Sequence, residues 1–190
     1  GYENTEGMQI ETFWRKYSVR LNTDFDLINN RLKIGENFEA NYINYKEGNE
    51  TERAVNMPPN IPVYTENGNW GGASLDVGMD DYRNPVRNLK LYKDNINKFL
   101  KMIGNVYADL RIINGLNLRT SFGVDYRGTY YRAIDPKWKE ADGSGREEKF
   151  NYVKNEQNHF LEYQWTNQIN YHANFGRHGI DAVAGMEFTK

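Results

Sequence analysis

The chain has 190 residues, with 24 lysines and arginines against 26 aspartates and glutamates, and a formal net charge of -2. This balance excludes a strongly basic protein that binds nucleic acid by neutralising phosphates. A mean hydropathy of -0.87 excludes a helical membrane protein. The absence of cysteine excludes disulfide scaffolds, cysteine-ligated zinc sites and thiol nucleophiles.

The first residues, 1–6, lack a basic stretch followed by an apolar one, so we expect no signal peptide there. Apolar runs are only a few residues long, whereas a membrane helix needs about 20. A role in a membrane would therefore have to use strands.

Period-two alternation over residues 12–28 and 32–46 is the first strong signal. These segments are longer than an ordinary strand of about 5 or 6 residues. Asn29-Asn30-Arg31 between them suits a tight turn, so the two segments predict a hairpin. In the first segment the odd positions from Phe13 are mostly apolar. The even positions from Lys16 to Asp26 are polar and include Arg20, Asn22 and Asp24.

Two further hairpins follow. Residues 98–112 and 116–128 alternate in the same way around Asn114-Gly115, a dipeptide typical of hairpin turns. Residues 157–174 and 178–190 form the third alternating pair. The polar positions of the second hairpin include Asp109 and Arg111.

The connections alternate in length. Turns inside the hairpins are very short, whereas the segments between hairpins, 46–97 and 127–157, are long. Bacterial outer-membrane barrels have short periplasmic turns, long extracellular loops and strands that alternate between lipid and lumen. The pattern therefore predicts an all-β protein: an antiparallel transmembrane β-barrel segment of about six long strands in three hairpins. Since six strands cannot close a spanning barrel, we expect a larger barrel.

Charged and amide side chains on one face of such strands need water or a hydrated plug, because they would cost several kcal/mol each in a dry core. The residues predicted to face the lumen are Arg20, Asn22, Asp24, Asp109 and Arg111.

An ordered set of short motifs resembles one known family. The set comprises Tyr17 to Asn22 with Leu32 to Gly35, Met57 to Tyr64 with Glu66 to Gly68, Asn84 to Val86, Gly104 to Ala108, Gly115 to Arg119 with Ser121 to Tyr126, and Trp165 to Tyr171 with His178 and Gly185. The chain resembles the SusC-like (RagA-like) TonB-dependent outer-membrane transporters of Bacteroidetes over most of its length.

This resemblance implies a piece of a plugged barrel of about 22 strands. We expect the plug domain to be absent from these 190 residues. The resemblance also implies localisation in the bacterial outer membrane as a multi-pass β-barrel in contact with lipid. It further implies a SusD-like surface lipoprotein as a lid, energy from the TonB complex, and a glycan (oligosaccharide) or peptide as cargo.

The sequence predicts neither an enzyme nor a cofactor or metal site. The three histidines, His159, His172 and His178, are scattered, and the adjacent acidic pairs fall in predicted loops without a histidine partner. No nucleic-acid partner is expected.

The long loop carries one candidate contact surface. Its prolines restrict the backbone, and its aromatic rings offer flat faces for stacking on a sugar or packing against a lid protein. The candidates for contact with substrate or lid are Pro59, Pro62, Tyr64, Trp70 and Tyr82, together with Trp138 from the second loop. In the opposing interpretation these aromatics pack the loop onto itself, because a loop of about 50 residues needs its own small core.

Two other interpretations stay open at this point. A soluble β-rich surface domain could bind glycans through exposed tyrosines and tryptophans. A structural or enzymatic β-sandwich would need two apolar faces packed together, which the charged even positions of the first strand oppose.

Overall fold

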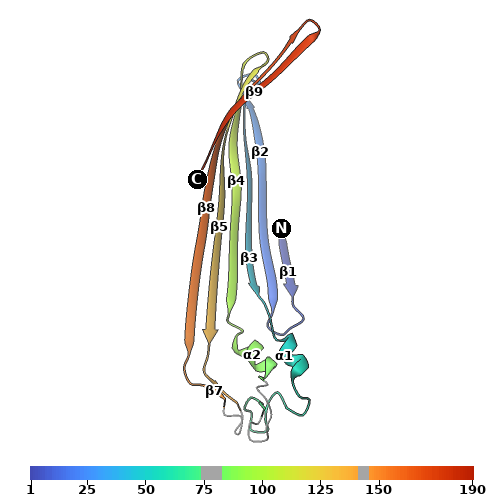
Figure 1. Ribbon diagram of the computed structural model, residues 1–190, viewed down its shortest axis with the longest axis vertical. Coiled ribbons are helices and arrows are strands. Elements are labelled where there is room, and N and C mark those ends of the chain that lie inside the picture. Colours follow the sequence, from blue (N-terminus) through green and yellow to red (C-terminus); the bar gives the residue numbers. More distant parts are fainter. Residues whose placement is uncertain (74–82, 141–145) are drawn as a thin grey trace.

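The computed structural model describes residues 1–73, 83–140 and 146–190. One antiparallel sheet dominates it, and its strands follow the order β1-β2-β3-β4-β5-β8-β9 (Figure 1). These strands are β1 (Tyr2–Glu6), β2 (Phe13–Leu27), β3 (Leu32–Lys46), β4 (Ile96–Ile113), β5 (Leu116–Asp135), β8 (Tyr152–Phe175) and β9 (His178–Thr189). The short strands β6 (Trp138–Lys139) and β7 (Glu147–Glu148) pair with each other.

Short turns lie at one end of the sheet and the long connections lie at the other (Figure 1). Helices α1 (Thr51–Asn56) and α2 (Pro85–Leu91) belong to the long-connection end. The six long strands, the three hairpins and the antiparallel order agree with the predicted fold class. The sheet is open, with β1 and β9 as its two edges.

The tight turns depend on residues that tolerate a left-handed backbone. Between β2 and β3, Ile28, Asn29 and Asn30 have φ of 53°, 52° and 61°, and the Arg31 amide donates to the Ile28 carbonyl. Asparagine adopts this region readily, whereas a β-branched residue such as Ile28 does so with strain. Gly115, at φ 84°, closes the β4–β5 turn.

Three features differ from the sequence prediction. Strand β5 continues to Asp135 rather than ending near residue 128, and β8 begins at Tyr152 rather than near residue 157. Residues 154–159 near the start of β8 are polar at every position, so this part of the strand has no apolar period to signal it. The short edge strand β1 was not predicted, because a single tyrosine among polar residues gives no alternation. Helices α1 and α2 likewise lie inside the segment predicted as a loop.

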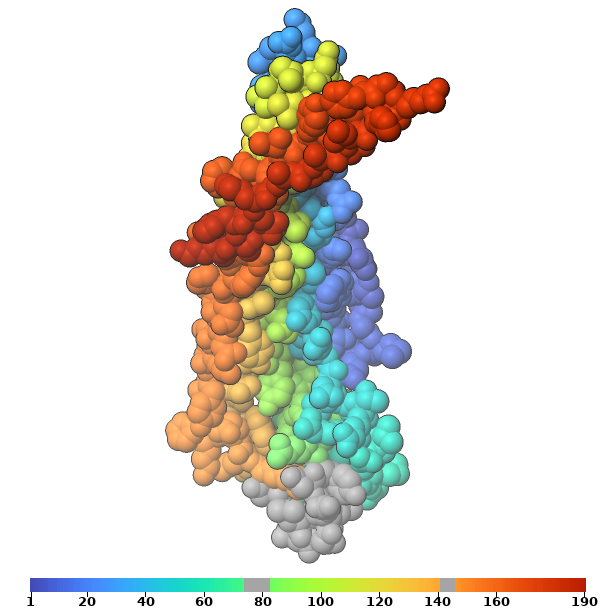
Figure 2. All heavy atoms as spheres, turned by 45° about the horizontal axis from the view of Figure 1, so that its top comes forward, coloured from blue at the N-terminus to red at the C-terminus, as the bar shows by residue number. Residues whose placement is uncertain are grey.

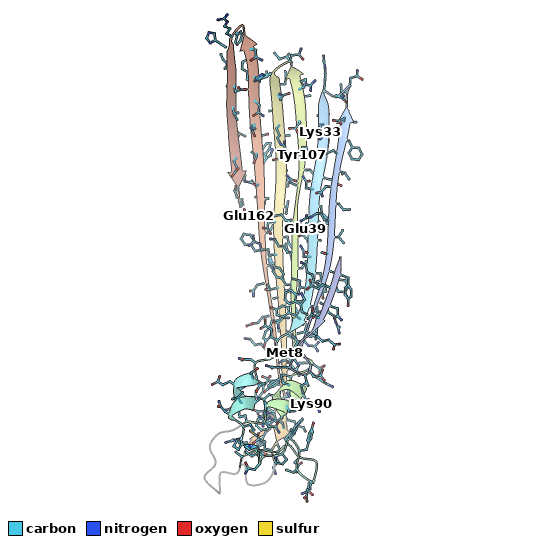
Figure 3. All side chains as sticks on the ribbon, turned by 90° about the vertical axis from the view of Figure 1, so that its right-hand side faces the viewer. Met8, Lys33, Glu39, Lys90, Tyr107 and Glu162 are labelled. Carbon is cyan, nitrogen blue, oxygen red and sulfur yellow. The ribbon has the colours of Figure 1, made fainter. Side chains whose placement is uncertain are left out.

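The sheet is a single layer with side chains on both sides (Figure 3), and Figure 2 shows its strands lying side by side in this layer. Of the residues that the structure describes, only Ala73 and Ala133 are buried apolar residues. Val19, Leu21 and Val106 remain 54%, 52% and 53% exposed. The sheet therefore has no packed apolar core of its own.

Strand register separates two faces, because residues directly opposite each other in an antiparallel pair lie on the same side. We call the side that carries Arg20, Asn22 and Asp24 the polar face, and the side that carries Val19 and Leu21 the apolar face. Rows of the apolar face, from the short turns toward the long connections, begin Leu27–Leu32–Leu110, Phe25–Ile34–Ala108, Thr23–Glu36–Val106, Leu21–Phe38–Gly104, Val19–Ala40–Met102 and Tyr17–Tyr42–Leu100.

Neither of the helices in the described ranges is long and apolar enough to cross a membrane.

Candidate functional site

The polar face collects all five residues that were predicted to face the lumen. Register pairs the β2 residues with β3, whose residues continue the rows into β4 and β5. One row runs Asn22–Asn37–Asn105, the next runs Asp24–Gly35–Tyr107, and a third runs Asp26–Lys33–Asp109–Arg119. Arg20, Asn22, Asp24, Asp109 and Arg111 thus share one side of the sheet.

Near the short turns, Tyr107 connects β4 to β2. Its hydroxyl donates to the Asp24 carboxylate, and Lys33 forms an ion pair with the same carboxylate at 3.1 Å. Figure 3 shows Tyr107 and Lys33 near each other toward the short-turn end of the sheet. Tyr107 reaches Asp24 across Gly35, where a Cβ atom would overlap both side chains. A glycine on β3 therefore makes this three-strand contact possible.

Arg119 of β5 extends this cluster. Its guanidinium lies 4.6 Å from the centre of the Tyr107 ring and 3.5 Å from the Asp109 carboxylate. The polar cluster, defined as Asp24, Lys33, Tyr107, Asp109 and Arg119, thus spans four neighbouring strands. Cation–π and ionic contacts of this kind fix side chains that would otherwise sample many rotamers.

Further toward the long connections, a shallow hollow of about 490 Å³ lies on the polar face. Arg20 and Glu39 form an ion pair along its rim, and the Asn37 amide donates to Asn105 at 2.9 Å. Gly123 lies directly opposite Asn105 and contributes no side chain to the row. Most side chains that line the hollow are charged groups and amides, with Ile103 between Glu39 and Asp125 as the apolar exception, so the hollow suits a hydrated or polar partner.

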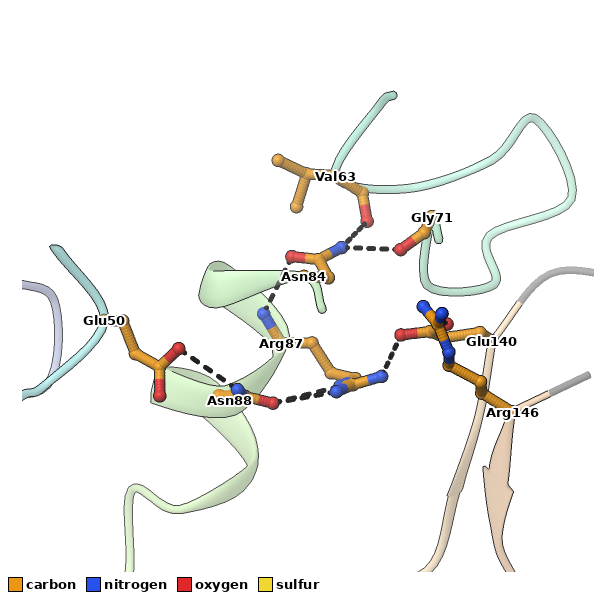
Figure 4. A network of polar contacts seen from close by, with 8 residues as sticks. All are labelled: Glu50, Val63, Gly71, Asn84, Arg87, Asn88, Glu140 and Arg146. Atoms are coloured by element: carbon orange, nitrogen blue, oxygen red, sulfur yellow. Dashed lines mark hydrogen bonds and ion pairs between the residues drawn. The ribbon is translucent and has the colours of Figure 1, made fainter. Parts of the chain in front are cut away.

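At the long-connection end, Asn84 organises the start of α2. Its side-chain oxygen accepts a hydrogen bond from the Arg87 amide at 3.1 Å, and Pro85 takes the first helical position. This is the usual chemistry of a helix N-terminus. The Asn84 amide nitrogen also donates to the carbonyls of Val63 and Gly71, at 2.8 and 3.0 Å (Figure 4). One asparagine thus anchors the helix to the loop before it.

Arg87 joins the two long connections. It is 1% exposed and forms an ion pair with Glu140 (Figure 4). Its guanidinium also lies 3.7 Å from the centre of the Trp138 ring. Its guanidinium also donates to Asn88, whose amide donates to Glu50 at 3.1 Å. Burial lowers the pKa of Arg87 and the Glu140 carboxylate opposes that shift. An arginine remains charged under such conditions, so the pair is a true buried ion pair.

An aromatic pair lies on the surface beside this network. The rings of Tyr64 and Trp70 lie 4.7 Å apart, and Lys90 donates to the Tyr64 hydroxyl at 3.0 Å. Tyr64 is 43% exposed. The Gly71 amide bonds to the Val63 carbonyl and closes the loop behind the two rings. We call Tyr64, Trp70 and Lys90 the aromatic platform.

The other predicted loop contacts have different positions. Trp138 stacks against the buried Arg87 and is part of the network rather than of the platform. Pro59 and Pro62 lie in the turn segment that leads to Tyr64. Tyr82 lies outside the described residues. The buried polar residues of the network were not predicted as site residues; only the Asn84-Pro85 pair carries a sequence signal, that of a helix start.

No group of three acidic, histidine or cysteine side chains suited to a metal ion occurs in the described ranges. His172 instead contacts Asp181 at 2.5 Å in the β8–β9 hairpin.

Comparison with known proteins adds to this geometry. No family model matches the chain. Along its entire length the chain is 26% identical to the TonB-dependent receptor P3 of Formosa agariphila, in an alignment that covers 19% of that receptor. A chain of the RagAB peptide transporter matches the structure with a TM-score of 0.74 at 20% identity, over 99% of this chain and 22% of that one.

The sheet has the fold of part of the RagA barrel wall. A second RagAB structure, the peptide importer in its closed-closed state, matches with a TM-score of 0.70 at 22% identity and the same coverage. The RagA-like fold confirms the predicted fold class and, with the receptor alignment, the predicted resemblance to TonB-dependent transporters. The chain spans about a fifth of the length of the proteins that it matches.

Proposed function

We propose that this chain forms part of the barrel wall of a TonB-dependent transporter in the bacterial outer membrane. The observation that carries the proposal is a single-layered sheet with one apolar and one polar face and no packed core among its described residues. A soluble glycan-binding domain or a sandwich needs an apolar interior, whereas a barrel wall needs lipid outside and water or a plug inside.

The height of the apolar face supports this proposal. From Tyr17 to Leu27 the strand rises about 33 Å, at about 3.3 Å per residue. A strand tilt of about 40° converts this to about 25 Å, the usual height of the apolar band of an outer-membrane barrel. The row beyond it begins Arg15–Asn44–Lys98, which is polar and suits water above the band.

In the proposed arrangement the polar face lines the lumen and contacts a plug. The polar cluster and the Arg20–Glu39 pair supply charges of both signs to that contact. The short turns face the periplasm and the long connections face outward. Transport is then vectorial uptake driven by the TonB complex through the plug, and no chemical step on the cargo is required.

The aromatic platform is the proposed contact for cargo or lid. Its rings are paired and supported from below by the buried network, so they present a preformed flat surface. The RagAB structures are of a peptide transporter, and a SusD-like partner over the loops of this chain, with a peptide or an oligosaccharide as cargo, is proposed on that basis.

Single-cysteine labelling tests the orientation of the two faces. These 190 residues contain no cysteine, so a cysteine can be placed at each of the positions 18 to 22 in the full-length transporter, with any cysteine outside this segment replaced. A water-soluble maleimide should label Ser18→Cys, Arg20→Cys and Asn22→Cys in isolated outer membranes once the plug is removed. Val19→Cys and Leu21→Cys should stay unlabelled until the membrane is dissolved in detergent. Equal labelling at all five positions would refute the membrane orientation.

A further inference from the structure

The apolar face carries its basic residues at one end only. In strands β2 to β5, all of whose residues the structure describes, the lysines and arginines of this face are Arg15, Lys46, Lys98 and Arg132. All of them lie beyond the row of Tyr17, on the side of the long connections. Between that row and the short turns these strands place no lysine or arginine on the apolar face. The two ends of the face therefore differ in charge.

Arg15 and Lys98 lie in the first row beyond Tyr17, on β2 and β4. The Arg15 guanidinium donates to the Asn4 side chain at 3.2 Å, and the Lys98 ammonium lies 5.5 Å from the centre of the Tyr130 ring. Two strand spacings, or about 10 Å, separate the two residues along the row. Lys46, one row farther out, is buried and donates to a backbone carbonyl instead. Arg15 and Lys98 are therefore the two cations that this face offers to a ligand nearest the apolar band.

These two cations lack a carboxylate partner within the described part of the chain. Four cations of the polar face form ion pairs with carboxylates of that face: Arg20 with Glu39, Lys33 with Asp24, Arg119 with Asp109 and Arg127 with Asp125. The row of Arg15 and Lys98, in contrast, contains no acidic residue and reads Asn4–Arg15–Asn44–Lys98–Tyr130–Gln157. The next row outward has one acidic residue, Glu6, opposite Phe13 at the β1 edge. An anion for Arg15 and Lys98 has to come from outside the sheet.

The height of this row indicates the source of the anion. Tyr17 marks the outer limit of the apolar band, and its ring lies 5.0 Å from that of Tyr2 and 6.3 Å from that of Tyr42. Such a group of tyrosines is typical of the boundary between hydrocarbon and headgroups. Arg15 lies two residues farther along β2, about 7 Å along the strand or about 5 Å in height at a tilt of about 40°. Lipid phosphates lie at this level, just outside the hydrocarbon.

We propose that Arg15 and Lys98 bind the phosphate groups of a lipid of the outer leaflet, whose acyl chains run along the apolar face toward the short turns. The Arg15 guanidinium donates to two phosphate oxygens at once, and the Lys98 ammonium supplies a second positive charge on the same row. Charge selects the headgroup, because basic side chains at a membrane surface attract anionic lipids. The inference rests on the proposed function, since it requires the apolar face to be in the membrane and the long connections to face outward.

The test uses the full-length transporter in phosphatidylcholine nanodiscs that contain equal small amounts of phosphorylated lipid A and of the same lipid A without its phosphates. Lipids retained by the protein after transfer to detergent are counted by native mass spectrometry. The wild type should retain the phosphorylated form about tenfold over the other, because each basic side chain near a membrane surface strengthens the binding of anionic lipid a few-fold. Arg15→Gln and Lys98→Gln should each lose part of this preference, and the double variant should lose all of it.

Lys16→Gln is the matched control. Lys16 follows Arg15 on the same strand and lies on the polar face, so this variant removes a cation at the same height and should keep the wild-type preference. A second control, the double variant Arg15→Lys, Lys98→Arg, keeps both charges and should retain most of the preference.

Equal retention of the two forms by the wild type, or an unchanged preference in the double glutamine variant, would overturn the lipid site. So would complete displacement of the phosphorylated form by millimolar inorganic phosphate, because the two cations would then bind any phosphate. A separate control addresses the proposed function. If the protein is removed from membranes by alkaline carbonate, the barrel proposal itself fails. If it stays and its folded barrel resists SDS without boiling, only the lipid inference is at stake.

Discussion

Tyr107 of β4 passes over Gly35 of β3 and donates its hydroxyl hydrogen to Asp24 of β2. Three strands are therefore joined by one side chain on the polar face. The contact requires a residue without a side chain at position 35, as well as the Tyr107 hydroxyl and the Asp24 carboxylate.

Gly35→Ala should disrupt this contact. The added methyl group overlaps the outer ends of the Tyr107 and Asp24 side chains, so we expect these side chains to move apart and the barrel to lose stability. The measurement is the temperature at which the full-length barrel loses its resistance to SDS. Tyr107→Phe is the control: it removes the hydroxyl but keeps the ring and the Lys33–Asp24 pair, and it should have the smaller effect. Equal stability of Gly35→Ala and wild type would contradict the account of this glycine.

Arg87→Met should loosen the long connections. It leaves Glu140 buried without its principal partner, and breaking a buried ion pair in this way costs about 3–5 kcal/mol. We expect faster tryptic cleavage within residues 47–95 of the full-length protein. Arg53→Met, which disrupts a more exposed ion pair with Glu50, should have little effect.

The double variant Arg87→Met, Glu140→Met separates charge from packing. Since both buried charges are removed together, it should be cleaved more slowly than Arg87→Met alone. A double variant that is cleaved as fast as the single one would show that the methionine at position 87, rather than the loss of Arg87 as the principal partner of the buried Glu140 carboxylate, loosens the loops.

Trp70→Ala should weaken capture of cargo or lid about tenfold, because large rings dominate the energetics of such contacts. The full-length transporter should retain its barrel and its SDS resistance, since the ring lies in the loop. Binding of the partner lipoprotein and of peptide is measured by calorimetry. Val55→Ala, an exposed apolar residue of α1 in the same connection, is the matched control. Unchanged binding of both ligands would leave the platform with a purely structural role.

Arg20→Glu should impair uptake or plug assembly, because it places two carboxylates opposite each other on the polar face. The reciprocal variant Arg20→Glu, Glu39→Arg restores the pair with its polarity reversed. If the Arg20–Glu39 ion pair only stabilises the barrel wall, the reciprocal variant should regain wild-type uptake. If it also contacts the plug, uptake should stay low although the barrel folds. Wild-type growth on the cargo with Arg20→Glu alone would count against any role in the lumen.

The sequence predicted the long strands because a sheet with one apolar and one polar face gives its strands a side-chain period of two. The predicted bounds of β3, residues 32–46, are those observed, and Asp24 and Asp109 share one face as their alternation implied. Beyond the apolar band this signal disappears. Residues 154–159 of β8 are polar at every position, and therefore on both faces, so no period marked this part of the strand.

The buried network escaped prediction for a different reason. Arg87 and Glu140 are 53 positions apart, and each lies in a segment whose composition suggests solvated loops. Their burial arises from the folding of one connection against another, which period and propensity do not encode. Trp138 illustrates the same limit: its ring faces Arg87 rather than open solvent.

The strand order described above has a consequence for assembly. Each strand of the main sheet hydrogen-bonds only to its immediate predecessor and successor within that sheet. A sheet of this kind can assemble by the addition of one hairpin after another. Each new strand pairs with the strand that joined the sheet before it, so no strand depends on a partner distant in the sequence. Adding or removing a whole hairpin at an edge of such a sheet would leave the pairings between all the other strands unchanged.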